Sequence, residues 1–192
     1  LYFQNYIEDD AGISYTYARN FANGYGLVLN PGGEHVEGYS NFLWVFLLSI
    51  FIKVGVFDPV ITPKILAMIF GIGTFIILYK LPKIAFGTEP RISDNISVIL
   101  LSASTPYVVW NISGLENSLF IFLIIAATYF YVRELNNNNL FPLSSFFFVC
   151  VALTRPEGIM YFIVAAIHKL VYISFAKNLT RKDLSWFTIF LL

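Results

Sequence analysis

Charged residues are scarce in this sequence. Lys, Arg, Asp and Glu make up 12% of its 192 residues, about half of the roughly 25% found in soluble domains, whereas 57% are apolar. A soluble chain of this length has too little interior to bury so many apolar side chains. The composition therefore predicts an integral membrane protein, with the lipid bilayer as its first partner.

The sequence also lacks a positive excess, since 12 Lys and Arg residues balance 12 Asp and Glu residues. No nucleic-acid partner is expected, because binding of that kind depends on a basic surface. There are two histidines and one cysteine. His35 has no partner at metal-ligand spacing and Cys150 has no second cysteine, so we expect neither a metal site, nor another cofactor, nor an internal disulfide.

Apolar runs divided by short polar turns occupy most of the chain. A membrane-spanning helix takes about 20 residues. The runs lie at about 42–57, 63–80, 95–110, 117–132, 140–153 and 158–176, with a shorter one from residue 184. We predict an all-α fold, a polytopic transmembrane helix bundle over 42–192 that is truncated at its C-terminal end.

Residues 1–41 are predicted to form a structured external loop that carries a juxtamembrane helix over 11–22. Asp10 is the expected N-cap, and the Gly24 region is expected to close the helix. Residues 1–4, LYFQ, match the end of a common tag-protease site. Both an expression remnant and the native end of an earlier helix fit these four residues.

Positive residues gather in alternate loops, at 81–94, 133–139 and 177–183. Because positive loops stay cytoplasmic, the turns at 111–117 and 154–158 are expected on the opposite, external face. Residues 1–41 share that face only if 42–57 does not cross the membrane. We favour this topology, because the run is short and contains Lys53, which is costly at the bilayer centre but tolerated at an interface.

Polar residues that the bundle otherwise lacks are concentrated in these external segments. Such residues are candidates for a site, because charge beside a membrane core is costly and usually faces a cavity or a partner. They are Asp9, Asp10, Tyr15, Arg19, His35, Glu37, Tyr39, Asn41, Glu116, Arg155 and Glu157. Capping and local ion pairs are the alternative for most of them. Adjacent aspartates exceed what capping needs, since the second carboxylate repels the first.

Sugar transfer from a lipid-phosphate donor would use carboxylates and arginines of this kind. A carboxylate takes the proton of the attacking hydroxyl, and the anomeric carbon passes through an oxocarbenium-like state. Arginine suits the departing phosphate because its planar fork donates two parallel hydrogen bonds. No metal is required for this reaction.

The order of motifs resembles one enzyme family. DDAGISYTYARNFANGYGLVLNPGGEHVEGYSNFLW, followed by SGLEN and ALTRPEG, is similar to the polyprenyl-phosphate-sugar glycosyltransferases of the GT-C superfamily, in particular to bacterial relatives of the mycobacterial terminal arabinofuranosyltransferases. The likeness is co-linear from Asp9 to Gly158. It implies a multi-helix enzyme of the bacterial inner membrane, whose first external loop carries the catalytic aspartate on the periplasmic or exterior side.

The resemblance also assigns roles by position. Asp9 and Asp10 match the catalytic acidic pair, and we expect Asp9 to be the base and Asp10 the helix cap. The residues expected to bind donor phosphate or sugar are Arg19, Glu37, Glu116, Arg155 and Glu157, with Tyr15, His35, Tyr39 and Asn41 as further candidates. The sequence departs from the family pattern at Gly12, Thr16 and His35. These departures affect the identity of the sugar and of the acceptor.

Two other functions fit the same residues. A transporter or flippase of a lipid-linked anionic substrate would use intramembrane charges, but it would place them near the bilayer midplane rather than at the ends of apolar runs. A non-catalytic protein that binds lipid-linked sugar would need the same site without the chemistry. For the enzyme, the acceptor is a glycan, a lipid or a protein.

Overall fold

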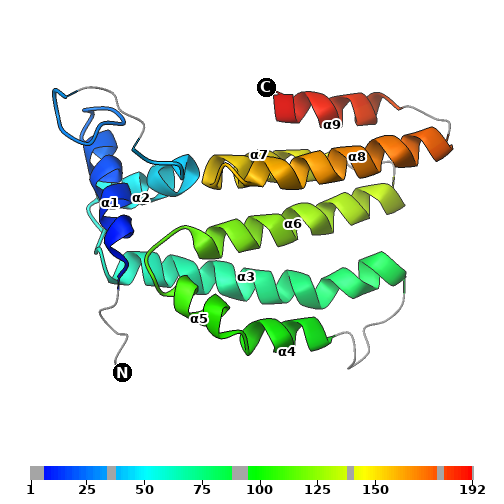
Figure 1. The fold of residues 1–192 in the computed structure, drawn as a ribbon, viewed down its shortest axis with the longest axis horizontal. Coiled ribbons are helices and arrows are strands. Elements are labelled where there is room, and N and C mark those ends of the chain that lie inside the picture. The colour runs from blue at the N-terminus through cyan, green and yellow to red at the C-terminus, as the bar shows by residue number, and fades with distance from the viewer. Residues whose placement is uncertain (1–6, 34–37, 88–94, 138–140, 177–179, 192) are drawn as a thin grey trace.

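The computed structural model describes residues 7–33, 38–87, 95–137, 141–176 and 180–191, in which every regular element is a helix (Figure 1). The helices are α1 (Asp9–Ala22), α2 (Phe42–Val54), α3 (Ile61–Phe86), α4 (Ile96–Ser102), α5 (Thr105–Asn111), α6 (Asn117–Asn136), α7 (Leu143–Thr154), α8 (Gly158–Ala176) and α9 (Arg181–Leu191). The prediction of an all-α fold is confirmed for these residues.

Three of these helices are long and apolar enough to cross a membrane, namely α3, α6 and α8. Their outward faces are apolar: Met68 on α3 is 60% exposed, and Val164 on α8 is 68% exposed. Such surface is unfavourable in water but matches the hydrocarbon of a bilayer. The protein is therefore suited to a lipid bilayer environment, as its composition predicts.

The run at 95–110 does not form one helix. It forms α4 and α5, two helices of 7 residues each, separated where Ser104 adopts extended backbone with ψ of 108°. Pro106 explains the break, because its ring lacks an N–H and would collide with the carbonyl of Ser102 in a continuous helix. The pair still returns the chain along α3 to the end from which α3 starts (Figure 1).

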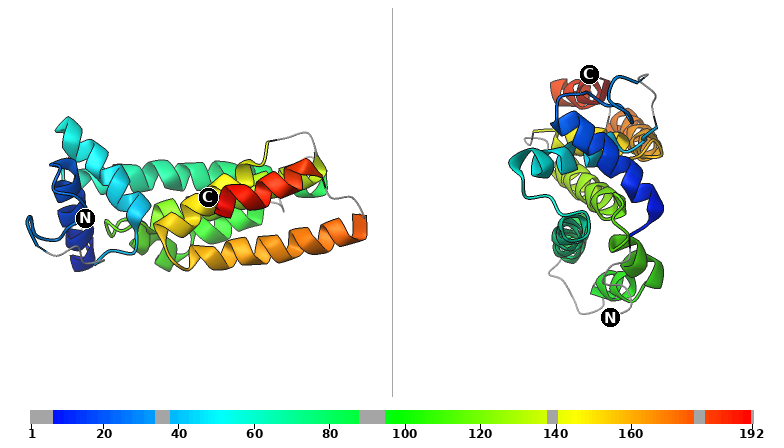
Figure 2. Two further views of the ribbon diagram at one scale, coloured as in Figure 1. Left: turned by 90° about the horizontal axis from the view of Figure 1, so that it is seen from above. Right: turned by 90° about the vertical axis from the view of Figure 1, so that its left-hand side faces the viewer.

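One end of the bundle collects the predicted external segments. Figure 1 shows α1 and α2 at the end where α3, α6 and α8 begin, and the view along the bundle in Figure 2 shows α1 lying across it. We call this the α1 end. α2 has 13 residues and α7 has 12, both fewer than the roughly 20 that span a bilayer. Because the predicted topology counts the run of α7 as a crossing, length does not single out α2, and the expectation that 42–57 does not cross stays a prediction.

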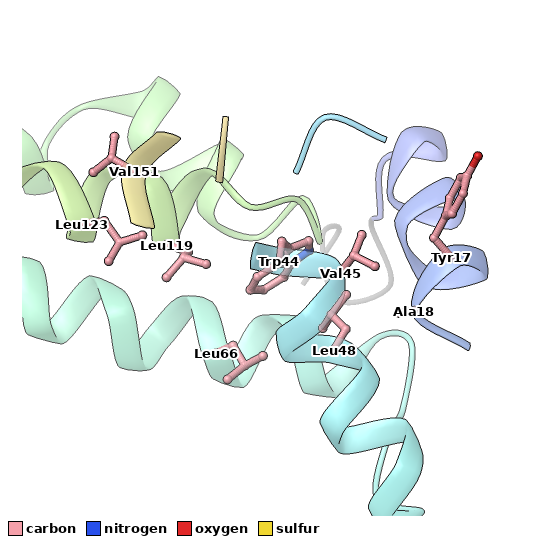
Figure 3. Close-up of a cluster of buried hydrophobic side chains, with 9 residues drawn as sticks. All are labelled: Tyr17, Ala18, Trp44, Val45, Leu48, Leu66, Leu119, Leu123 and Val151. Carbon is pink, nitrogen blue, oxygen red and sulfur yellow. The ribbon is translucent and has the colours of Figure 1, made fainter. Parts of the chain in front are cut away.

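A buried cluster attaches α1 and α2 to the long helices (Figure 3). Trp44 and Leu48 of α2 are fully buried, and the cluster joins them to Leu66 of α3, Leu119 of α6 and Val151 of α7. Burying an apolar side chain of this size contributes about 1.5–3 kcal/mol. Apolar packing thus anchors the α1 end to the long helices.

A second cluster fixes α9 against α7 and α8 at the other end of the bundle. Trp186 of α9 is fully buried and stacks on Phe162 at 5.0 Å between ring centroids. Its indole N–H donates to Ser144 Oγ at 2.7 Å. Beside it, the buried Lys169 Nζ lies 3.0 Å from Asp183 Oδ1. This arrangement gives the buried ammonium its compensating charge.

Candidate functional site

A polar cavity of about 680 Å³ lies at the α1 end. Its volume falls within the roughly 300–1,000 Å³ of small-molecule sites. The lining residues come from α1, from the segment before α2, from α5, and from the turns before α6 and α8: Glu8, Asp10, Ile13, Ser14, Gly38, Ser40, Asn41, Trp110, Leu115, Glu116, Asn117 and Arg155. Segments far apart in the sequence therefore share one site.

The start of α1 brings Asp10 to the cavity. Glu8, not Asp10, occupies the N-cap position, so the expected cap is wrong. The Glu8 N–H donates to Ser113 O at 2.9 Å, which ties the helix start to the turn before α6. Asp10 lies in the first helical turn and lines the cavity, whereas Asp9 is not among the lining residues. The two adjacent carboxylates therefore occupy different environments.

The Tyr15 hydroxyl makes the second tie between α1 and that turn. It donates to Gly114 O at 3.3 Å, and burial raises the pKa of the phenol, so that it keeps its donor proton. Gly114 has a φ of +89°, and a Cβ built there would lie 2.5 Å from the Tyr15 hydroxyl oxygen. Only glycine fits this close approach without strain.

Glu116 joins three elements from a buried position. It is 7% exposed, and its Oε2 accepts a hydrogen bond from Asn41 Nδ2 at 2.8 Å. The same amide donates to Ser14 Oγ at 2.9 Å. Oε1 of Glu116 lies 3.6 Å from Arg155 Nη1. A buried carboxylate needs such partners, since an unpaired one would be strongly destabilising.

Arg155 is placed by the proline that follows it. A residue before proline avoids the helical region, and Arg155 has extended backbone, with φ −153° and ψ 141°, that ends α7. Its guanidinium donates to Asn117 Oδ1 at 2.9 Å and lies 3.5 Å from Glu157 Oε1. The side chain is still 35% exposed. It is therefore a fixed cation that a ligand can reach.

The Glu157 side chain pairs with Arg155 and also lines a second, apolar groove. A hydrogen bond from its own backbone N–H lowers the pKa of its carboxyl, and the positive charge of Arg155 lowers it further. Glu157 also lines a groove of about 740 Å³ between α6 and α8, with Met160, Tyr161 and Val164 along it. His168 at its far end lies about 16 Å along the helix. An apolar groove thus begins next to the polar cavity.

Three of the remaining predicted residues that the structure describes, Tyr15, Arg19 and Tyr39, are not in the cavity lining. Arg19 and Tyr15 line a separate pocket of about 270 Å³ between α1 and the segment after α2. The ring of Tyr39 packs on that of Tyr17 at 4.8 Å between centroids. His35 and Glu37 lie outside the described residues. Of the two arginines expected near a donor phosphate, only Arg155 lines the cavity.

Eight of the lining residues were not among the predicted site residues: Glu8, Ile13, Ser14, Gly38, Ser40, Trp110, Leu115 and Asn117. Ser14 was detectable, because it lies four residues after Asp10 and so on the same helical face. Asn117 was detectable as the last residue of SGLEN. Trp110 carried no such signal, since it ends an apolar run and looks like any other lipid-facing aromatic residue.

Comparisons with family models, with curated proteins and with solved structures found no match to this chain. The resemblance to the GT-C enzymes therefore rests on the motifs alone. Among the described residues there is no group of three or more His, Cys, Asp or Glu side chains that could hold a metal ion. What the site does has to be argued from the cavity and its groove.

Proposed function

We propose that the protein is a membrane glycosyltransferase of the GT-C type, which moves a sugar from a polyprenyl-phosphate donor to an acceptor hydroxyl at the external face of the bacterial inner membrane. One observation carries this proposal. The carboxylate of Asp10 and the guanidinium of Arg155 line the same cavity, and Glu157, paired with Arg155, lines the adjoining apolar groove. A lipid-linked phosphate has the complementary shape and polarity.

In the proposed reaction, Asp10 is the general base. Its carboxylate takes the proton of the acceptor hydroxyl while that oxygen bonds to the anomeric carbon of the donor. The bond between the anomeric carbon and the phosphate oxygen breaks, and the polyprenyl phosphate leaves with the electron pair. Arg155 stabilises the charge that develops on this phosphate. Atoms and charge balance without a further reactant.

The arrangement of Glu116 and Asn117 supports this role for Arg155. Both side chains hold the guanidinium before any ligand arrives, and a preorganised cation stabilises developing charge without reorganisation in the transition state. The groove between α6 and α8 would take the first isoprene units of the donor. Its apolar wall faces the region where bilayer hydrocarbon is expected.

The experiment that tests the proposal compares Asp10→Asn with Asp9→Asn. Membranes that contain each variant receive radiolabelled polyprenyl-phosphate sugars, with arabinofuranosyl and mannosyl donors in the panel, and transfer and donor binding are measured separately. Asp10→Asn should lower transfer by about 10²–10⁴-fold, the usual contribution of a general base, with donor binding retained. Asp9→Asn should keep most of the activity, because Asp9 does not line the cavity.

Three results would contradict the proposed function or the proposed base. Binding of the donor by the wild-type protein without any transfer would identify a non-catalytic binder. Movement of the intact donor across vesicle membranes, unaffected by Asp10→Asn, would identify a flippase. Full transfer activity in Asp10→Asn would remove Asp10 as the base.

A further inference from the structure

We propose that Trp110 is a stacking platform for a sugar ring of the acceptor, which makes the acceptor a carbohydrate. This inference rests on the proposed function and deepens it. Trp110 lines the polar cavity and is 46% exposed. The other two tryptophans, Trp44 and Trp186, are 0% exposed and belong to the two hydrophobic clusters.

The cavity lining combines an aromatic side chain with polar side chains, and a sugar ring has a matching apolar face and polar edge. A sugar ring presents C–H groups on a face and hydroxyl groups around its edge. The negative face of an aromatic ring attracts such C–H groups, and Trp110 is the aromatic residue of the cavity lining. Carboxylates accept hydrogen bonds from hydroxyl groups, and amides both accept and donate them; Asp10, Glu8 and Asn117 supply these groups from the same cavity. A lipid or peptide acceptor would not need this combination.

The position of Trp110 assigns it to the acceptor rather than to the donor. It lies on α5, whereas Arg155 follows α7, and Figures 1 and 2 show α5 and α8 on opposite sides of α6. The start of α1 is bonded to Ser113, three residues after Trp110. Asp10 is therefore on the Trp110 side of the site. Because Asp10 is the proposed base, the acceptor hydroxyl that it deprotonates has to bind on this side.

The burial of the other tryptophans makes a direct optical test possible. Acrylamide quenching of intrinsic fluorescence reports mainly on Trp110, because a quencher in solution does not reach a fully buried indole. The probes are methyl α-arabinofuranoside, methyl α-mannopyranoside and methyl β-galactopyranoside. Sorbitol is the control, since it carries hydroxyl groups but has no ring face. At least one glycoside should protect the wild-type protein saturably, and sorbitol should not.

Equal protection by sorbitol, or no protection by any glycoside, would overturn the inference. The Trp110→Phe variant checks the source of the signal, because the quenching that remains in it should not respond to glycosides. The optical test needs neither donor nor transfer. Protection without sugar transfer would therefore leave the Trp110 site in place and refute only the glycosyltransferase proposal.

Kinetics provide the second readout, with the best-protecting glycoside as acceptor. Trp110→Ala should raise the KM for the acceptor by about 10-fold and leave the KM for the donor within about 2-fold. Trp110→Phe should recover most of the loss, because it keeps an aromatic face. Tyr25→Ala is the matched control, since Tyr25 is 56% exposed but is not in the cavity lining. An equal rise in both KM values, or an equal effect of Tyr25→Ala, would refute a stacking role.

Discussion

Removing the Glu116 carboxylate should destabilise the α1 end more than removing any exposed carboxylate beside it. Glu116 is 7% exposed and accepts the Asn41 amide at 2.8 Å. A hydrogen bond to a charged group is worth about 1.5–3 kcal/mol. The 3.6 Å ion pair with Arg155 adds about 0–1 kcal/mol, because the arginine is 35% exposed and its charge is screened.

The sum for Glu116→Ala is a loss of about 2–4 kcal/mol in the free energy of unfolding. A chain of 150–250 residues shifts its Tm by about 2–4 °C per kcal/mol, so Tm should fall by roughly 5–15 °C. Glu116→Gln should lie between the wild type and Glu116→Ala, because it keeps an acceptor for Asn41 and loses the charge. Thermal unfolding of the purified protein in detergent measures all three.

Glu157→Ala is the matched control, since both carboxylates pair with the same guanidinium. The Glu157 side chain is 58% exposed and lies 3.5 Å from Arg155, so its loss should cost no more than about 1 kcal/mol. The reasoning fails if Glu157→Ala lowers Tm as much as Glu116→Ala does. It fails too if Glu116→Ala and Arg155→Ala are additive in the double variant, because partners in contact should show coupling of about 0.5–3 kcal/mol.

Two further substitutions test packing by the same thermal assay. Gly114→Ala should cost about 1–3 kcal/mol, because φ is +89° and the new Cβ meets the Tyr15 hydroxyl at 2.5 Å; Gly12→Ala, in a helix with nothing within 4 Å, should instead stabilise by about 0.5–1 kcal/mol. The two substitutions should change the free energy of unfolding in opposite directions, and a loss of stability in both variants would contradict this reasoning. Lys169→Met should cost about 3–5 kcal/mol, because it removes the cation beside the Asp183 carboxylate, which then keeps only its hydrogen bonds from Thr180. The double variant with Asp183→Asn should recover part of that loss, and no recovery would show that the pair is not the cause.

Helices and their type followed from local features of the sequence. Long apolar runs predicted helices at 63–80, 117–132 and 158–176, and the structure has α3, α6 and α8 there. The run at 95–110 was wrongly read as one continuous apolar segment, because hydrophobicity alone does not show that Pro106 interrupts the helix. The prediction that charged turns gather at one end was reached by counting crossings, and the cavity unites residues from these turns.

Single residues within the motifs were harder to predict. From the sequence we expected Asp9 to be the base and Asp10 the helix cap, but Glu8 is the cap and Asp10, not Asp9, lines the cavity. Their different angular positions on α1 explain why only one of them reaches it. Arg19 and Arg155 looked equivalent as phosphate ligands, yet Arg19 lines a different pocket. Its motif is intact, but the packing of α1 against α2 decides which way that helical face points.

Local sequence features are enough to identify this protein as an apolar helical chain whose charged and polar residues are concentrated between its apolar runs. Hydrophobicity, turn residues and proline act over a few neighbouring positions, so their effect on local structure can be predicted from the sequence alone. The three-dimensional packing was needed to show that one cavity is lined by Asp10, Glu116, Arg155 and Trp110, and that an apolar groove adjoins it. These are contacts between residues far apart in the chain, and they depend on how side chains such as Trp44 pack the helices together.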